Sequence, residues 1–113
     1  MKKLRGLKKR EQEAVKEFCL RVKVALGNDL VGLRLFGSKA RGTGNRDSDV
    51  DIAVVVRQRN SGVWDKVMDI AFDANLKWDV YISPRVIESR ALRDTKWRAT
   101  GFVQNLEREG IPL

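Results

Sequence analysis

Seven consecutive residues, Val50–Val56, constrain the fold more than any other segment of the chain. Five of the seven are β-branched, and β-branched side chains favour the extended conformation. The segment is therefore predicted to be a strand. Because side chains alternate along a strand, the even-numbered residues from Val50 to Val56 share one apolar face, which other elements must cover.

Two segments with helical spacing flank this strand in the sequence. Residues 11–26 and residues 63–74 repeat apolar side chains at intervals of three and four, which places them on one face of a helix. Gly27 and Asn28 are expected to end the first of these helices. The sequence therefore predicts an amphipathic helix on each side of the 50–56 strand.

Two further strands and a C-terminal helix complete the predicted elements. Leu30–Phe36 is short and apolar, as a buried strand is, and Lys77–Ser83 alternates apolar and polar residues as a third strand. Ser83 followed by Pro84 predicts a helix start, because serine caps a helix and proline suits its first position. A last helix is expected to end at Gly110 and to turn inward Phe102, Val103 and Leu106.

The order of these elements predicts an α+β or α/β domain, with a three-stranded sheet and helices mainly on one side of it. A chain of 113 residues has room for one such domain, over residues 1–113, so we do not expect a two-domain enzyme. Any function must then fit one compact core or be completed by a partner.

The composition excludes several kinds of chemistry. Hydrophobic residues make up 42% and charged residues 34%, which is typical of a soluble globular protein. The single cysteine, Cys19, cannot form an internal disulfide and is expected to act as a small hydrophobe. Because the chain has no histidine, a thiolate–imidazole zinc site and an imidazole base are impossible. No apolar run approaches the roughly 20 residues of a membrane span, so we expect a cytoplasmic protein.

The formal net charge of +8 is concentrated at the N-terminus. Residues 1–10 carry +6 and contain no acid, which leaves +2 for the rest of the chain. A terminal basic run of this kind is usually a solvated tail, and we expect one here. The alternative is an arm that binds RNA phosphates or an acidic partner through counterion release.

The candidate chemistry lies where the 50–56 strand begins. Asp49 and Asp51 are two residues apart, so their carboxylates project from the same face. Asp79, in the predicted third strand, looks toward them if the two strands are adjacent. Three converging carboxylates need cations to neutralise them, and an all-oxygen ligand set suits Mg²⁺ or Mn²⁺. The sequence therefore predicts a divalent-metal site.

The loop before these aspartates is glycine-rich and longer than a hairpin requires, as functional loops often are. Gly37 lets the backbone approach a ligand closely, and Ser38 with its neighbouring N–H groups can hydrogen-bond phosphate oxygens. Arg41, together with Lys39, is a candidate for charge-assisted contacts to the same phosphates. The loop is therefore predicted to hold phosphate beside the metal site.

Simpler interpretations of the same residues stay open. Asp49 and Asp51 also suit a solvated strand entry, where aspartate favours turns. The loop is equally compatible with a flexible connection that exposes basic residues. Its conformational freedom comes from the glycines Gly37, Gly42 and Gly44.

Other known motifs do not match. A calcium-binding loop that opened at Asp47 would need glycine where Ile52 stands. A P-loop would need lysine directly after Gly42, where Thr43 stands. The tryptophans fit packing positions better than base-stacking platforms, and we expect burial of Trp64, Trp78 and Trp97.

The spacing of the loop and the aspartates resembles a known signature. Gly37-Ser38, ten residues, then Asp49-Val50-Asp51 is similar to the signature of the nucleotidyltransferase superfamily related to DNA polymerase β. The segment from Gly37 through Ile52 resembles its small single-domain branch, the minimal nucleotidyltransferases, and the likeness extends over most of the chain. The resemblance implies the nucleotidyltransferase fold, in which a small mixed sheet is packed with helices.

The resemblance also implies a role for each site residue. In that family the glycine and serine hold the triphosphate, the paired aspartates bind two metal ions, and a third carboxylate on a following strand completes the site. Asp73 is an alternative third carboxylate, but it lies four residues after Asp69 on a predicted helix and better fits a solvated face. By resemblance the site residues are Gly37, Ser38, Asp49, Asp51 and Asp79.

The implied reaction needs no histidine. A hydroxyl attacks the α-phosphorus of a nucleoside triphosphate, one metal ion lowers the pKa of that hydroxyl, and the other steadies the departing pyrophosphate. Asp79 is expected to assist removal of the hydroxyl proton. The implied cofactor is Mg²⁺ and the implied substrate is ATP.

The short chain leaves the acceptor site incomplete. Related enzymes that modify aminoglycosides or extend nucleic acids usually add a second domain, whereas only about thirty residues follow the predicted third strand here. A homodimer or another protein must supply the rest. Minimal nucleotidyltransferases commonly pair with a small helical HEPN-type ribonuclease toxin and act as antitoxins by transferring AMP to a tyrosine of that toxin. We therefore expect a nucleotidyltransferase of this antitoxin type.

Two other functions stay open. The chain is compatible with a binding module that masks its partner by contact and does not use the nucleotide site. It is also compatible with an enzyme that modifies an aminoglycoside or a nucleic acid as a homo-oligomer. A cationic acceptor would favour an acidic cleft, which the basic loop does not offer outside the three aspartates.

Overall fold

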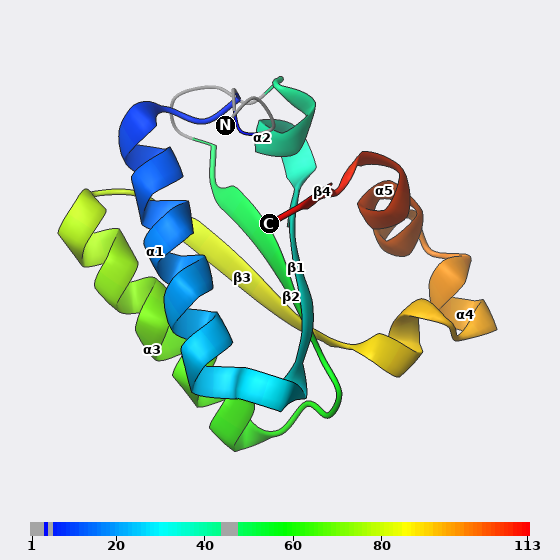
Figure 1. The fold of residues 1–113 in the computed structure, drawn as a ribbon. Coiled ribbons are helices and arrows are strands. Elements are labelled where there is room, and N and C mark those ends of the chain that lie inside the picture. The colour runs from blue at the N-terminus through cyan, green and yellow to red at the C-terminus, as the bar shows by residue number, and fades with distance from the viewer. Residues whose placement is uncertain (1–3, 5, 44–47) are drawn as a thin grey trace.

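The structure is a computed structural model that describes residue 4, residues 6–43 and residues 48–113 (Figure 1). Gly44 and Asp47 of the glycine-rich loop lie outside the described residues. The same is true of residues 1–3 and residue 5 in the basic N-terminal run.

A mixed β-sheet forms the centre of the molecule, and its strand order within the described residues is β3-β2-β1-β4. The strands are β1 (Leu30–Phe36), β2 (Val50–Val56), β3 (Ile82–Glu88) and β4 (Ile111–Pro112). β1 pairs antiparallel with β2 and with β4, whereas β2 and β3 run parallel. The α+β class and the strands at 30–36 and 50–56 are confirmed. The expected three strands become four, because β4 is too short to show any alternation in the sequence.

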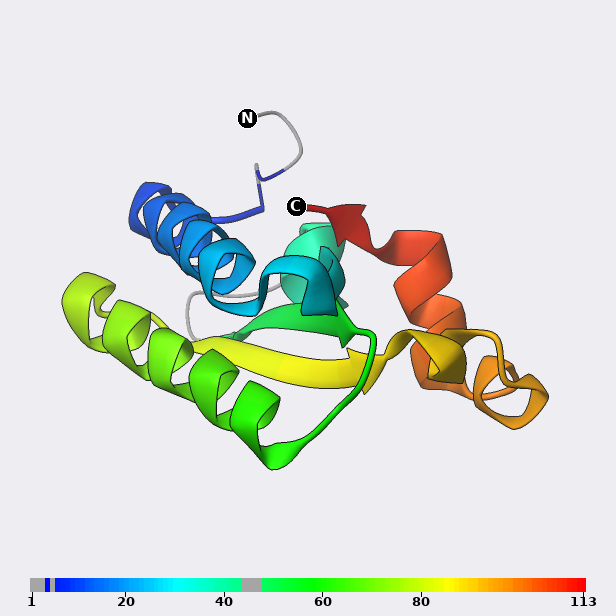
Figure 2. The same ribbon diagram turned by 60° about the horizontal axis from the view of Figure 1, so that its bottom comes forward.

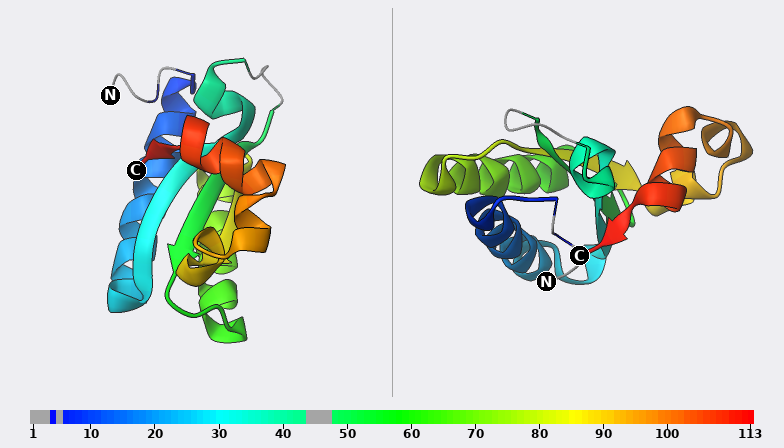
Figure 3. Two further views of the ribbon diagram at one scale, coloured as in Figure 1. Left: turned by 90° about the vertical axis from the view of Figure 1, so that its right-hand side faces the viewer. Right: turned by 90° about the horizontal axis from the view of Figure 1, so that it is seen from above.

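Helices lie on both sides of this sheet. α1 (Lys9–Leu26) and α3 (Ser61–Trp78) cover one face, and α5 (Gly101–Glu109) lies on the other side (Figure 2; Figure 3, right). The expectation of helices mainly on one side is therefore only partly correct. The short helices are α2 (Gly37–Arg41) and α4 (Thr95–Arg98), and the 3₁₀ turns are η2 (Gly27–Asp29) and η3 (Ser89–Leu92). Among the described helices, none is long and apolar enough to cross a membrane.

The two faces of β2 are buried to different extents. The even-numbered residues from Val50 to Val56 join the main core, where they pack with α1 and α3 as predicted. On the opposite face a small cluster contains Ala53, Ile87 and Leu106, with Phe36 and Phe102 packed against it. This second cluster begins only at Ala53, so the start of β2 is left uncovered by apolar side chains on that face.

The third strand begins at Ile82 and not at Lys77, because α3 continues through Trp78. Trp78 follows Ala74 by four residues, so its side chain extends the apolar face of the helix instead of starting a strand alternation. Its indole Nε1 donates a hydrogen bond to Glu17 of α1 at 3.1 Å. Asp79 then ends the helix in the left-handed conformation, with φ 53°.

The predicted helix start at Ser83 and Pro84 is wrong, because both residues lie inside β3. Proline has no N–H group, but β3 is the edge strand of the sheet, where a missing donor is tolerated. The first helix after β3 is α4, which Asp94 caps, and the last helix, α5, is capped by Thr100, whose hydroxyl oxygen accepts a hydrogen bond from the Val103 N–H at 3.3 Å. The predicted burial of Val103 and Leu106 and the helix end at Gly110 are confirmed.

The described part of the basic N-terminal run is not a solvated tail. Leu4 and Leu7 are buried in the main core, and α1 begins at Lys9. Gly6 lies so close to α2 that a Cβ at this position would overlap the carbonyl oxygen of Lys39. The run therefore packs beside the short helix that opens the glycine-rich loop.

Burial of the tryptophans was expected but is found only in part. Trp78 is half-buried and packs against the main core. Trp64 and Trp97 are 43% and 51% exposed, so the prediction is wrong for these two residues. Trp64 lies on α3, whose buried face is formed by other side chains, and Trp97 lies on α4, which has no buried residue. Cys19 is buried in the core, as a small hydrophobe would be.

Candidate active site

Asp49 and Asp51 lie where β2 begins. They share one face of the strand, and side chains of α5 cover that face only from Ala53 onward. Asp51 is paired with Phe36, the last residue of β1, and Asp49 directly precedes the strand. The Asp49 side chain is exposed, whereas Asp51 is half-buried. The two carboxylates therefore share one face, as their spacing predicts, and a ligand can reach both.

Gly37 brings the glycine-rich loop against this pair. It follows Phe36 with φ 75°, a conformation that favours glycine over any residue with a Cβ. A Cβ at Gly37 would overlap the Oδ2 atom of Asp51. The Asp51 carboxylate therefore lies directly against the Gly37 backbone, so the structure joins the first glycine of the loop to the second aspartate of the pair.

The electrostatic environment disfavours a charged Asp51. Burial raises the pKa of the Asp51 carboxyl, and the neighbouring charge of Asp49 raises that pKa further. The guanidinium of Arg85 acts in the opposite direction. A bound cation beside both carboxylates would relieve the repulsion between them, which is the electrostatic situation expected of a metal site.

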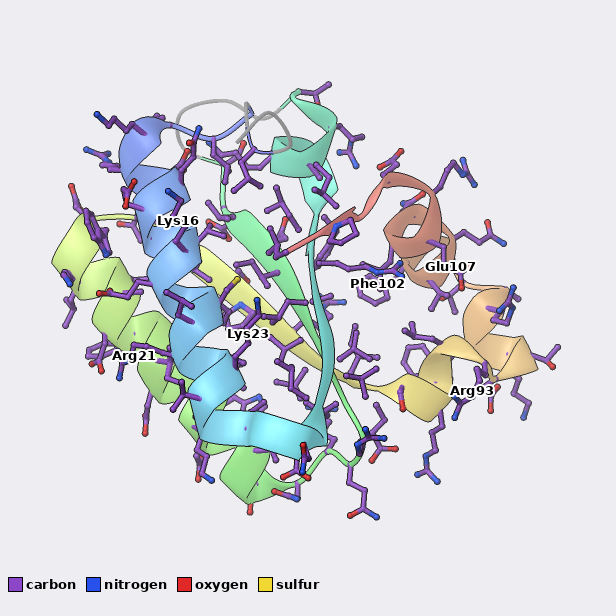
Figure 4. All side chains as sticks on the ribbon, in the orientation of Figure 1. Lys16, Arg21, Lys23, Arg93, Phe102 and Glu107 are labelled. Atoms are coloured by element: carbon purple, nitrogen blue, oxygen red, sulfur yellow. The ribbon has the colours of Figure 1, made fainter. Side chains whose placement is uncertain are left out.

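Arg85 also lies near this pair, although the sequence analysis does not identify it as a site residue. In the parallel register Asp51 is paired with Ser83, and Arg85 follows two residues later on the same face of β3. Its guanidinium carbon lies 4.8 Å from the ring centroid of Phe102, which lies between α5 and the sheet (Figure 4). The strand alternation could have revealed it, but the Ser83-Pro84 pattern indicates a helix over the same residues.

Asp79 does not join Asp49 and Asp51. It ends α3 in a left-handed conformation before β3 begins, and it lines a cavity of about 450 Å³ together with Ser48, the residue that precedes Asp49. Asp73, the alternative, forms an exposed ion pair with Arg21 at 3.2 Å, so its interpretation as a solvated residue is confirmed. Within the described residues, no group of three acidic, histidine or cysteine side chains is arranged to hold a metal ion. The described residues therefore do not assemble the three carboxylates into a metal site, and a role for Asp79 at the site stays a prediction.

The basic residues of α2 are held by carboxylates from other helices. The Lys39 ammonium lies 3.3 Å from Glu11 of α1, and with 3% and 6% of these side chains exposed the pair is buried. Lys39 therefore joins α2 to α1 and is not placed to contact phosphate. Arg41 lies 3.0 Å from Glu109 of α5 and keeps 42% of its side chain exposed. Gly37, whose backbone lies against Asp51, and Ser38 are half-buried at the start of α2.

The carboxylate pair fits a metal ion that is held partly by its substrate. Mg²⁺ in enzymes is commonly bound by one or two carboxylates, with phosphate oxygens and water as the other ligands. Asp49 and Asp51 supply hard oxygen ligands on one accessible face, and neither needs a histidine or cysteine neighbour. The residues present therefore suit the ion that the resemblance implies, even without Asp79.

Comparisons with known proteins identify the family. The family described as "Nucleotidyltransferase domain" matches residues 11–106, which include Gly37, Asp49 and Asp51. Two proteins of Methanocaldococcus jannaschii are named "Putative protein adenylyltransferase", MJ0141 and MJ0604. The first is 32% identical over 102 residues, covering 89% of this chain and 96% of its own. The second is 33% identical over 105 residues, covering 91% and 97%.

Solved structures of similar fold agree with this family. A structure described as a "putative minimal nucleotidyltransferase" superposes with a TM-score of 0.56 at 22% identity, covering 92% of this chain and 95% of that one. A mutant of the toxin–antitoxin pair MntA–HpeT gives a TM-score of 0.52 at 19% identity, covering 88% and 70%. A toxin–antitoxin structure with AMP-PNP gives 0.51 at 22% identity, covering 84% and 68%. Taken with the site geometry, these matches show that the chain belongs to the nucleotidyltransferase domain family and is a nucleotidyltransferase enzyme.

Proposed function

We propose that this enzyme is Mg²⁺-dependent and transfers AMP from ATP to a hydroxyl group of a partner protein. The observation that carries the proposal is the Asp49–Asp51 pair with Gly37 packed against Asp51. The similarity to proteins named as protein adenylyltransferases supports an adenine nucleotide and a protein acceptor.

Each residue of the site has a proposed task. Asp49 and Asp51 hold the two Mg²⁺ ions, and the Ser38 hydroxyl and the backbone N–H groups that follow Gly37 bind the triphosphate. When bound, Mg²⁺ neutralises phosphate charge and lowers the pKa of the attacking hydroxyl. Arg41 contacts the nucleotide only by exchanging its ion pair with Glu109 for a phosphate.

The proposed reaction is a substitution at the α-phosphorus of ATP. The acceptor oxygen forms a bond to that phosphorus and gives up its proton, while the bond to the bridging oxygen breaks and pyrophosphate leaves. The start of β2 is open on one face, so both the nucleotide and the acceptor hydroxyl can approach the carboxylate pair. Positioning and charge neutralisation supply most of the acceleration in reactions of this class.

The partner that we propose is a HEPN-type ribonuclease toxin, with this chain as its antitoxin. Support comes from the shared fold with an MntA–HpeT toxin–antitoxin structure and with a toxin–antitoxin structure that was solved with AMP-PNP.

Label transfer from ATP tests the proposal directly. The enzyme, co-expressed with the product of the adjacent gene, is incubated with Mg²⁺ and ATP labelled in the α-phosphate, and the products are resolved by intact mass. We expect AMP on the partner and a loss of transfer of at least about 100-fold in Asp49→Asn, because the metal site is disrupted. Asp69→Asn, an exposed position on α3, is the matched control.

Asp79→Asn separates the two candidate roles of that residue. Because Asp79 forms no metal-binding group with the carboxylate pair within the described residues, we expect this variant to keep transfer within about threefold of the unmodified enzyme. A loss as large as that of Asp49→Asn would restore Asp79 to the catalytic group. A stable complex that shows no transfer from any nucleotide, with toxin activity still masked, would favour the contact-masking function instead.

A further inference from the structure

A groove along the outer edge of β3 has no task in the reaction proposed above. Its volume is about 1070 Å³, and it lies between β3, the first half of α3 and the segment from η3 to α5. Arg85 lines it and also acts electrostatically on Asp51, so the groove adjoins the candidate active site. We call it the β3 groove, and its lining includes Arg59, Trp64, Arg85, Glu88, Arg93 and Trp97.

Positive charge dominates the lining of the β3 groove. The described lining residues supply four guanidinium groups and two carboxylates, Glu88 and Asp94. Glu88 accepts hydrogen bonds from the Arg59 backbone N–H at 2.9 Å and from Arg90 Nε at 2.6 Å. Asp94 caps α4 by accepting from the Lys96 N–H at 2.9 Å. Both carboxylates therefore serve the fold, and the groove presents a surplus of guanidinium groups to a ligand.

Aromatic side chains accompany these arginines. Trp64 and Trp97, from the two sides of the β3 groove, are the tryptophans that the core leaves exposed. The guanidinium of Arg85 is held over the Phe102 ring, where a planar cation is favourably placed. Exposed tryptophan beside arginine is the combination most enriched where protein partners bind tightly.

The backbone of β3 is poorly suited to pairing with an added strand. The side-chain amide of Asn75 donates to the Ile82 carbonyl at 3.1 Å and accepts from the Ile82 N–H at 2.7 Å. Two residues later on the same edge, Pro84 has no N–H group. The start of this edge is therefore closed to an added strand, and the β3 groove, which is lined from Pro84 onward, offers a ligand its lining side chains.

We propose that the β3 groove binds an acidic segment of the acceptor protein and thereby delivers its hydroxyl to the Asp49–Asp51 pair. The inference rests on the proposed function, because it names the surface that positions the acceptor. Carboxylates of the segment pair with the groove arginines, and its apolar side chains pack on the two tryptophans. A protein segment is favoured over RNA because it can place its carboxylates beside the arginines and uncharged residues opposite Glu88 and Asp94, whereas RNA carries a phosphate at every nucleotide.

Two probes of defined chemistry test the surface directly. The full chain is titrated, in the absence of ATP, into a fluorescein-labelled copolymer of glutamate and tyrosine and separately into single-stranded oligo(U) RNA. Arg59→Glu/Arg93→Glu reverses two charges in the groove. Lys23→Glu/Lys66→Glu makes the same charge change on α1 and α3, outside the groove lining (Figure 4). Circular dichroism confirms folding, and Gln replaces Glu at both arginines if the first variant does not fold.

We expect the groove variant to bind the glutamate–tyrosine copolymer at least about tenfold more weakly, and the control variant to change within about twofold. AMP transfer to the copolymer should fall in parallel, while the affinity for AMP-PNP is unchanged. Equal weakening in both variants, no binding of the copolymer, or a groove effect confined to oligo(U) would overturn the proposal.

The same experiment separates this inference from the function on which it rests. Groove-dependent binding without any transfer from ATP would support the docking surface and count against the proposed reaction. Transfer that is unaffected by Arg59→Glu/Arg93→Glu would overturn the docking surface and leave the reaction intact.

Discussion

Gly37 and Gly42 have the same φ of 75°, but only Gly37 touches a side chain of the candidate site. A Cβ at Gly37 would overlap Asp51, whereas a Cβ at Gly42 would meet open space. The two positions therefore separate backbone strain from displacement of the carboxylate. The surroundings therefore leave room for a side chain at Gly42 but not at Gly37.

Alanine at each position makes this separation measurable. We expect Gly42→Ala to lower the free energy of unfolding by about 1 kcal/mol, from backbone strain alone, and to retain AMP transfer. Gly37→Ala should destabilise the protein further and lower transfer at least about tenfold, because Asp51 must move. Urea denaturation and label transfer give the two quantities, and equal losses of activity in both variants would contradict this role of Gly37.

The raised pKa of Asp51 predicts that a neutral residue at this position stabilises the fold, whereas the glycine variants should destabilise it. Burial and Asp49 raise this pKa in the folded protein, so the charged carboxylate destabilises the fold at any pH above that value. We expect Asp51→Asn to raise the free energy of unfolding at neutral pH in the presence of EDTA, and to abolish transfer. The gain should shrink as the pH falls through the folded-state pKa, where Asp51 itself becomes neutral. Asp69→Asn is the exposed control, and a destabilised Asp51→Asn protein would refute the electrostatic account.

At the scale of elements, one buried ion pair fixes the position of α2. Glu11 lies in the first turn of α1, accepts a hydrogen bond from the Lys8 backbone N–H at 2.8 Å and contacts the Lys39 ammonium. The Glu11 carboxylate thus caps the N-terminus of α1 and also anchors α2. Because α2 begins with Gly37 and Ser38, this anchor also determines where the loop meets the aspartates.

Substitution of Glu11 tests the anchor. Glu11→Gln keeps an oxygen for the Lys8 N–H but leaves the buried Lys39 ammonium without its carboxylate, and we expect a loss of about 3 kcal/mol in the free energy of unfolding. The double variant Glu11→Gln/Lys39→Met should recover part of that loss, because the buried charge is gone. Urea denaturation of the two single variants and the double variant completes the cycle, and strictly additive losses would exclude a direct interaction.

The elements also show which parts of the fold could be predicted from the sequence. β2 and its two aspartates follow from a run of β-branched residues with a single alternation. β3 does not, because Trp78, Val80 and Ile82 alternate like a strand although Trp78 belongs to a helix. Trp78 is held in the helix by a hydrogen bond from its indole to Glu17, a residue far away in the sequence. With β3 misplaced, Asp79 is assigned to the site in place of Arg85.

At the scale of the whole molecule, the sheet divides a structural side from a working side. α1 and α3 bury one face completely, whereas α5 covers the other only in part (Figure 3). The carboxylate pair and the β3 groove both lie outside the main core. Stability and function can therefore be altered by different sets of substitutions, except at the α2 anchor.

Cys19 offers a probe of global opening on the structural side. Burial raises the pKa of the Cys19 thiol to about 11, and its side chain is almost inaccessible in the core. We expect the native protein to react with a disulfide reagent at least about 100-fold more slowly than the unfolded chain, because both the thiolate fraction and access are low. Absorbance of the released thiol in increasing urea gives the rate, and since the chain has one cysteine the signal is unambiguous. A rate equal to that of a free thiol would place Cys19 outside the core.

The Asn75 clamp and Pro84 have a consequence for the protein at high concentration. An uncovered edge strand is a template on which further copies can polymerise, and natural proteins blunt such edges with proline and local hydrogen bonds. Here the blunted part of β3 is its first half, between Ile82 and Pro84. This first half of the edge is thereby protected from sheet-to-sheet growth, so a further copy could pair only with the half beyond Pro84, where the side chains of the β3 groove line the strand.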